Sequence, residues 1–249
     1  MKRHKIDRPK LYHELAWLWP ILSPPEDYVQ EATIFANTIK KNSHRPPKTL
    51  LDLGCGGGHN DMTLKKHFLV TGVDLSGKML ALASKLNPEI EYIRGDMRNV
   101  RLGRKFDAVA IFDSINYMLS EDDLRRAFRT AYQHLNPGGV FITYLEETKE
   151  SFTQGKAHSK KSRKDDVELT YIERLYDPIP EDKTYESTMV YLIRKGGELE
   201  VFVDRHILGI FRTREVIAIL AESGFETMLL KFKIPGEDEC PMLVGVKPL

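Results

Sequence analysis

Residues 50–59, with the sequence LLDLGCGGGH, constrain the fold of this chain more than any other stretch. A short apolar run enters a glycine-rich turn, and the residues that follow, 60–67, are able to form a helix. Glycines in such a turn allow positive φ angles and let backbone N–H groups approach a ligand closely. About twenty residues further on, a second apolar run ends in Asp74. A strand, a glycine turn and an acid closing the next strand predict a ribose-bearing cofactor at the carboxyl ends of parallel strands.

The spacing of these glycines distinguishes between two kinds of cofactor. A nicotinamide-dinucleotide fingerprint has the pattern Gly-x-Gly-x-x-Gly, but the sixth position counted from Gly54 is His59. Here the pattern is Asp-x-Gly-x-Gly-x-Gly, starting at Asp52, and it resembles the first motif of class I S-adenosylmethionine-dependent methyltransferases. Later segments resemble further motifs of that family in the family's order: GVDLS at 72–76, GDM at 95–97, FDAV at 106–109 and LNPGG at 135–139.

The pattern of apolar segments predicts the fold class. Strands and helices alternate over residues 49–145, which favours a parallel sheet covered on both faces. The resemblance implies an α/β, doubly wound, seven-stranded sheet of strand order 3-2-1-4-5-7-6 with the last strand antiparallel. Ser120 and Thr213 are predicted to cap helices, the first helix carrying Leu135 on its core face and the second ending at Gly224. The predicted strands are 49–53, 69–73, 90–94, 106–112, 140–145, 225–233 and 242–247, with 234–238 joining the last two.

Residues 146–210 interrupt this alternation. They begin with a polar, basic run, 149–164, which is predicted to be a mobile loop. Three strand-like segments follow at 167–176, 185–194 and 199–208, with a tight hairpin at 195–198, KGGE. Such an antiparallel insertion after strand five resembles that of small-molecule N-methyltransferases of the sugar and glycine types, in which it covers the substrate or forms a dimer contact.

The predicted domain organisation has three parts. Residues 1–48 form an N-terminal helical lid, 49–145 and 211–249 a Rossmann-like domain that binds S-adenosylmethionine, and 146–210 the antiparallel β insertion. In related methyltransferases the segment before the first strand often begins Tyr-x-x-x-Ala and folds over the cofactor, and Tyr12 to Ala16 resembles it. Tyr12 and Trp19 are therefore candidates for contact with cofactor or substrate, and Pro25 is predicted to start a helix.

The resemblance assigns cofactor-binding roles by motif position, with S-adenosyl-L-methionine as cofactor and S-adenosyl-L-homocysteine as its product. Asp74 would accept hydrogen bonds from both ribose hydroxyls, since a carboxylate suits a vicinal diol. Asp52 would orient the glycine loop or the cofactor ammonium, and Asp96 would accept from the exocyclic amine of adenine. The predicted cofactor-binding residues are Asp52, Gly54, Cys55, Gly56, Asp74, Leu75, Asp96, Met97 and Phe112, and no metal site is predicted.

The acceptor side is predicted from the loop after strand four, FDSINYM at 112–118, which in the resembled families borders the transferred methyl group. Tyr117 and Tyr12 are the candidate catalytic residues, with Asp113 able to balance a cationic acceptor or to cap the loop. Sugar N-methyltransferases often carry a histidine near the position of Tyr117, so the general base is open, and His206 is a further candidate. The predicted reaction is in-line methyl transfer to a small-molecule acceptor, on an amine nitrogen in preference to an oxygen.

Two alternatives of other classes remain open at this stage. One is an RNA methyltransferase gripping phosphate through the basic 149–164 run; the net charge of +1 and the absence of an Asn-Pro-Pro-Tyr motif argue against it. The other is a non-catalytic regulatory protein that binds S-adenosylmethionine. Two cysteines give no disulfide framework, no apolar run approaches a membrane span, and the basic start is a poor signal peptide. A cytoplasmic monomer or homodimer is expected.

Overall fold

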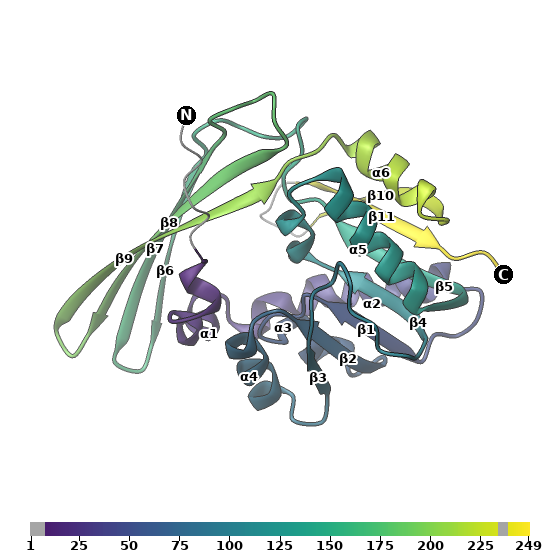
Figure 1. The fold of residues 1–249 in the computed structure, drawn as a ribbon. Coiled ribbons are helices and arrows are strands. Elements are labelled where there is room, and N and C mark those ends of the chain that lie inside the picture. Colours follow the sequence, from purple (N-terminus) through teal and green to yellow (C-terminus); the bar gives the residue numbers. More distant parts are fainter. Residues whose placement is uncertain (1–7, 234–238) are drawn as a thin grey trace.

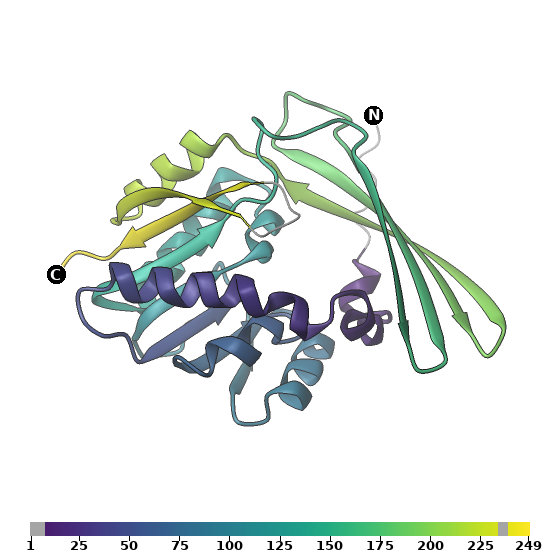
Figure 2. The same cartoon turned by 180° about the vertical axis from the view of Figure 1, so that it is seen from behind.

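The computed structural model describes residues 8–233 and 239–249. Its main body is a twisted sheet with helices on both faces, and a second sheet of long strands projects from one end of that body (Figure 1). Figure 2 shows the same two parts from behind, with the short helices of the N-terminal segment lying between them. The predicted lid residues 1–7 and the predicted link 234–238 lie outside the described residues.

The main sheet has the predicted topology. Its strand order is β10-β11-β5-β4-β1-β2-β3, which corresponds to 3-2-1-4-5-7-6 when its strands are numbered along the chain. Strand β11 runs antiparallel to both of its neighbours, and the other pairings are parallel. The strands are β1 Thr49–Leu53, β2 Leu69–Asp74, β3 Glu91–Arg94, β4 Phe106–Ile111, β5 Leu135–Tyr144, β10 Glu226–Phe232 and β11 Cys240–Val246.

Both faces of this sheet are buried, as the alternation of strands and helices predicts. Leu51 and Val109 belong to the core on the side of α5 and α6, whereas Leu50 and Ala108 belong to the core on the side of α2. The helices are α2 Val29–Asn42, α3 His59–Leu64, α4 Gly77–Leu86, α5 Glu121–His134 and α6 Thr213–Glu222. Because β1 pairs with β2 and with β4 in parallel, the carboxyl ends of these three strands lie at one edge of the sheet.

Two helix ends differ from the sequence prediction. Thr213 is the first residue of α6 and Arg212 is its N-cap, since the carboxylate of Glu215 already accepts the Arg212 N–H at 3.1 Å. Leu135 opens β5 directly after α5, because it pairs with Phe106 of β4 before the Asn-Pro-Gly-Gly turn is complete. The predicted cap at Ser120 is confirmed, since its hydroxyl accepts the Asp123 N–H at 3.1 Å.

The insertion is a four-stranded antiparallel sheet, one strand more than predicted. Strands β7 Val167–Tyr176, β8 Thr184–Lys195 and β9 Glu198–Gly209 match the predicted segments, and Lys195 pairs with Glu198 across the predicted hairpin. The prediction of a loop over 149–164 is wrong for its second half, which forms β6 Ala157–Lys164. This strand is exposed almost throughout and pairs with β7 along its whole length, so backbone pairing forms it without a buried side-chain pattern.

The N-terminal segment packs on the insertion. It consists of short turns of helix, η1 Lys10–Tyr12, η2 Ala16–Leu18, α1 Trp19–Leu22 and η3 Pro25–Tyr28, the last beginning at Pro25 as expected. Its buried leucines and Ile21 form one apolar cluster with residues of β7 and β8, including Leu169, Tyr171 and Tyr191. Within the residues described, no helix is both long and apolar enough to cross a membrane.

Candidate active site

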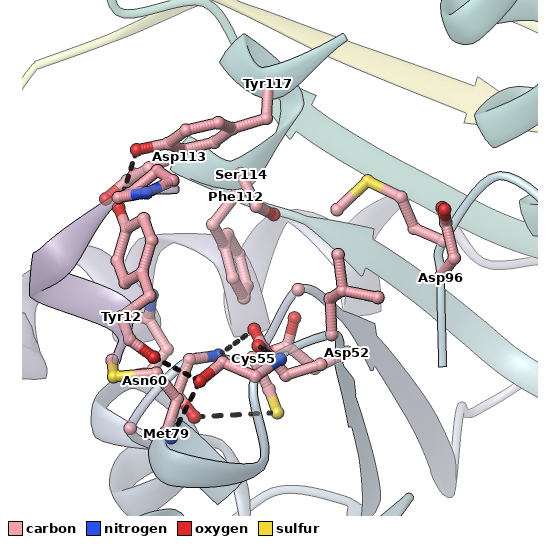
Figure 3. A pocket seen from close by; sticks show the side chains of 18 of the residues that line it. Tyr12, Asp52, Cys55, Asn60, Met79, Asp96, Phe112, Asp113, Ser114 and Tyr117 are labelled. Atoms are coloured by element: carbon pink, nitrogen blue, oxygen red, sulfur yellow. Dashed lines mark hydrogen bonds between the residues drawn. The ribbon is translucent and has the colours of Figure 1, made fainter. Parts of the chain in front are cut away.

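A cavity of about 420 Å³ lies at the carboxyl ends of β1, β2 and β4, beneath the N-terminal segment. All of the predicted cofactor-binding residues and both candidate catalytic tyrosines are among its lining residues, and Figure 3 shows several of them around it. The segment ahead of β1 contributes Tyr12, Trp19 and Tyr28. No residue of 146–210 lines this cavity, and the insertion packs against the N-terminal segment that does.

The glycine loop is shaped by the close approach of other groups. Gly54 has φ +84° and its N–H donates to the Val73 carbonyl at 2.6 Å; a Cβ there would collide with the Ser114 side chain. A Cβ at Gly57 would lie 2.7 Å from the Trp19 ring. Neighbouring side chains therefore pack against the backbone of Gly54 and Gly57, whereas a Cβ at Gly56 would meet only the end of the Met79 side chain, at 3.6 Å.

Asp74 ends β2 and faces the same cavity. Its carboxylate accepts the N–H of Gly56 at 2.9 Å and that of Ser76 at 2.7 Å. Burial raises the pKa of this carboxyl, and hydrogen bonds from backbone N–H groups partly offset the effect. Since a carboxylate has about four acceptor positions, it keeps capacity for further donors in the cavity.

Two buried acids lie beneath the glycine loop. Asp52 and Asp61 of α3 are almost fully buried, and burial and their mutual repulsion raise the pKa of Asp52 well above its usual range. Burial also raises the pKa of Asp61, to about 6, although the Tyr92 hydroxyl donates to its carboxylate at 2.9 Å. Asp52 Oδ1 has no hydrogen-bond partner among the described residues. The thiol of Cys55, which lies nearby, likewise has a raised pKa because of burial.

The predicted adenine end has a different electrostatic character. Asp96 receives a forked contact from the Arg98 guanidinium, with nitrogen–oxygen distances of 2.7 to 3.2 Å. Hydrogen bonds from Arg98 lower the pKa of Asp96 although burial opposes this. Arg98 also bonds Asp123 of α5 at 2.9 Å. Leu75 is 63% exposed, so it offers a free apolar surface at the mouth of the cavity.

An aromatic stack at the other end was not predicted from the sequence. The ring of His59 stacks on Trp19 with centroids 5.8 Å apart and meets the edge of Tyr28 at 5.4 Å. Burial lowers the pKa of His59 to about 4, so the ring is neutral at pH 7. Trp19 Nε1, His59 Nδ1 and Asn60 Oδ1 are buried without a hydrogen-bond partner among the described residues. Other lining residues that the sequence reasoning did not single out are Ser76, Met79 and Ser114.

The candidate catalytic tyrosines meet at the cavity wall. The hydroxyls of Tyr12 and Tyr117 are 2.8 Å apart, although the residues are 105 positions apart in sequence. Behind them His206 is fully buried, with Nδ1 2.6 Å from the Tyr117 hydroxyl and Nε2 3.0 Å from Asp204. His206 does not line the cavity, so it reaches the cavity only through Tyr117.

Comparison with protein families gives the class of this fold and site. Residues 50–139 match the family model described as a methyltransferase domain. This match, together with the sheet topology and the likeness to a methyltransferase solved with S-adenosylmethionine bound, identifies a methyltransferase domain that uses S-adenosylmethionine.

Within that class the chain resembles the sugar N-methyltransferases. It is 29% identical to a dTDP-3-amino-3,4,6-trideoxy-α-D-glucopyranose N,N-dimethyltransferase of Streptomyces venezuelae, over 83% of this chain and 86% of that protein. The crystal structure of DesVI from the same organism superposes with a TM-score of 0.83 at 26% identity, covering 99% and 100% of the two chains. CalS10, an amino pentose methyltransferase from Micromonospora echinaspora solved with S-adenosylmethionine bound, gives 0.79 at 25% identity over 98% and 100%.

Proposed function

We propose that this protein transfers the methyl group of S-adenosylmethionine to an amine nitrogen of a small molecule, and that the acceptor is an amino sugar. The observation that carries the proposal is a likeness over nearly the whole chain, insertion included, to the structures of DesVI and of an amino pentose methyltransferase. A relative named as an amino-sugar N,N-dimethyltransferase matches over 83% of the chain. A likeness limited to residues 50–139 would support only the cofactor.

The cavity residues fit this cofactor. Gly56 lines the cavity, and a Cβ there would meet only the end of the Met79 side chain at 3.6 Å, so its backbone has room for a ligand. Asp74 is an ionisable acceptor for vicinal hydroxyls. Asp52 Oδ1, buried and without a partner among the described residues, is suited to a cationic donor such as an ammonium group. In this assignment Asp96, Met97 and Leu75 hold the adenine end, and the remaining predicted contacts are Gly56, Cys55 and Phe112.

Methyl transfer from a sulfonium to an amine needs no covalent intermediate with the protein. When bound, the cofactor supplies an electrophilic methyl group on a sulfonium. The residues of this chain hold the acceptor nitrogen in line with that group and exclude water from it. Tyr12 and Tyr117 would orient the acceptor amine, and the segment that carries Tyr12 and Trp19 would serve as the lid.

The insertion, 146–210, would hold the lid in place, or take part in a dimer contact. The basic residues of β6 do not line the cavity, which weakens the alternative of an RNA methyltransferase. The cytoplasmic location and the choice between monomer and homodimer stay predictions from the sequence.

Calorimetry followed by a turnover assay tests the proposal. Both S-adenosylmethionine and S-adenosylhomocysteine are expected to bind, and NAD is not. Turnover is then measured with dTDP-3-amino-3,4,6-trideoxy-α-D-glucopyranose and with the matched nucleotide sugar that carries a hydroxyl in place of the amine. Methylation of the amine alone supports the proposal. Tight cofactor binding without turnover of any amine would favour the non-catalytic alternative.

A further inference from the structure

A closed circuit of hydrogen bonds joins the lid, the turn η4 Asp113–Tyr117 and strand β9. It runs from the Tyr12 hydroxyl to the Tyr117 hydroxyl at 2.8 Å, and on to Nδ1 of His206 at 2.6 Å. Nε2 of His206 lies 3.0 Å from Oδ2 of Asp204, and that oxygen accepts the backbone N–H of Leu11 at 2.8 Å. Since Leu11 precedes Tyr12, the circuit returns to the lid where it began.

The chemistry of the last link fixes the direction of every donor. Hydrogen bonds from His206 and from the backbone N–H groups of Lys10 and Leu11 lower the pKa of Asp204, although burial opposes this. An ionised carboxylate only accepts, so Nε2 of His206 carries a proton, and in the neutral tautomer that this defines Nδ1 is an acceptor. The Tyr117 hydroxyl must then donate to Nδ1 and accept from the Tyr12 hydroxyl. The Tyr12 oxygen is left able to accept a hydrogen bond from a group in the cavity.

We propose that this circuit is a proton relay that takes a proton from the ammonium form of the acceptor amine, with His206 and Asp204 as its positioning residues. The inference rests on the proposed function, because the amine acceptor of that function arrives at neutral pH mostly as an ammonium ion. It assigns a role to a histidine that lies outside the cavity and that touches neither cofactor nor acceptor.

The transfer balances in protons and electrons. The ammonium nitrogen gives a proton to the Tyr12 oxygen, Tyr12 passes its own proton to Tyr117, and Tyr117 passes its own to Nδ1 of His206. The imidazolium that results lies beside the Asp204 carboxylate, so its buried charge is paired. The freed lone pair of the amine forms the N–C bond while the S–C bond breaks and its electron pair goes to sulfur. After the product leaves, the proton returns along the same path to solvent.

The phenols cannot serve alone as the base. Burial raises the pKa of Tyr117 well above its ordinary value and also raises that of Tyr12, so each phenol can pass a proton on but does not persist as phenolate at neutral pH. His206 is the group that holds the proton. The titratable groups packed around the Tyr117–His206 pair are Tyr12 from the lid, Asp113 from η4, Glu173 from β7, Tyr185 and Tyr191 from β8 and Asp204 from β9.

A pH profile separates a relay from a structural role. The assay uses the full chain, saturating S-adenosylmethionine and dTDP-3-amino-3,4,6-trideoxy-α-D-glucopyranose. In His206→Gln the amide keeps hydrogen-bonding groups but cannot take up a proton, so only acceptor bound as free amine reacts. Its kcat is expected to fall about tenfold per pH unit below the pKa of the amine, with KM little changed, whereas the wild-type kcat stays nearly level there. Asp204→Asn is expected to shift the profile in the same direction by less.

The matched control is His134→Gln. His134 is a buried histidine of α5 whose ring nitrogens lie 2.8 Å from the Thr130 carbonyl oxygen and 3.1 Å from the Leu102 backbone nitrogen, outside the circuit. It should keep the wild-type profile. If His206→Gln also keeps the wild-type profile while wild type methylates the amine, the relay is wrong and the proposed function stands. If wild type methylates no amine, the proposed function fails and the relay falls with it.

Nitrogen NMR gives a readout that needs no acceptor. In protein labelled with ¹⁵N-histidine, the His206 signals, assigned by their loss in His206→Gln, are expected to show the Nε2–H tautomer. The Nδ1 resonance should move when Tyr117→Phe removes its donor. A proton on Nδ1 in the folded protein would reverse the direction of the circuit and overturn the proposal.

Discussion

The single carboxylate of Asp74 connects two loops of the site. It accepts from Gly56 in the glycine loop and from Ser76 at the start of α4, and it lines the cavity. A residue in this position has two separable effects on cofactor binding, because it holds backbone in place and also offers acceptors to the ligand. A useful test must separate the two effects.

Removing this carboxylate is expected to weaken cofactor binding. Hydrogen bonds to a charged acceptor are worth about 1.5–3 kcal/mol, so Asp74→Ala should raise the Kd of S-adenosylhomocysteine at least tenfold, measured by calorimetry on protein whose melting curve shows a folded state. The control is an analogue of the ligand without the ribose hydroxyls. If Asp74 binds those hydroxyls, Asp74→Ala should raise the Kd of the analogue much less than that of S-adenosylhomocysteine. Equal losses for the two ligands would assign Asp74 to loop structure alone.

The sequence motifs identified most residues of the cavity but not the contacts between residues that lie far apart in the chain. The motif positions named residues that all line one cavity, since motif spacing places them at the ends of adjacent strands. The sequence could not bring Tyr28 and Trp19 to His59, because that contact depends on how the lid folds back. It named Tyr117 and His206 separately, but they lie 89 positions apart, with most of the insertion between them.

At the scale of elements, the strands with an internal apolar pattern were predictable and β6 was not. β7 alternates buried Val167, Leu169 and Tyr171 with residues that face outward. The sequence of β6, AHSKKSRK, has no such alternation and its side chains are nearly all exposed. Its extended conformation depends on backbone pairing with β7, so the residues of β6 alone do not predict it.

The proposed lid packs against the insertion through one apolar cluster. Leu18 of the lid is completely buried, and it belongs to the same apolar cluster as Leu169 of β7 and Tyr191 of β8. Deleting 146–210 would therefore expose the buried side of the lid as well as removing the insertion. A single truncation within the cluster tests the connection more cleanly than a deletion.

Leu169→Ala is expected to loosen the lid and weaken cofactor binding. Truncating a buried leucine costs about 2–5 kcal/mol, and part of that loss should appear as lid opening, because the cluster joins the lid to the sheet. The Kd of S-adenosylhomocysteine should rise, and limited proteolysis should cut faster within residues 8–24. The control is Leu124→Ala, an equally buried leucine of α5 in the core of the main sheet. If the two variants lose affinity in proportion to lost stability alone, the insertion does not hold the lid.

At the scale of the whole molecule, the family motifs predicted the order of the main sheet but not where the insertion would lie. That position follows from the apolar cluster of the lid and from the contacts of β9 with η4, which no local pattern specifies. The main body also buries two neighbouring carboxyl groups, which is unfavourable when both are ionised. Asp52 and Asp61 are buried together beneath the glycine loop, and each has a raised pKa.

This buried pair makes the stability of the whole molecule depend on pH. The Asp61 carboxyl has a pKa of about 6 in the folded state, above the ordinary value of 3.8, so between these pH values the folded state binds more protons than the unfolded state. The free energy of unfolding therefore falls as pH rises through this window. The pKa of Asp52 is raised as well, which adds to this fall.

Asp61→Asn should remove much of this pH dependence. An amide oxygen can still accept the Tyr92 hydroxyl but never becomes charged, so the variant is expected to be more stable than wild type at pH 8 and to lose that advantage towards pH 4. One carboxyl contributes at most about 1.4 kcal/mol per pH unit to the slope. Urea unfolding at half-unit pH steps measures the slope, with Asp166→Asn, an exposed residue beside β7, as a control that should leave it unchanged. An Asp61→Asn slope equal to that of wild type between pH 4 and 7 would mean that folding does not raise the pKa of Asp61.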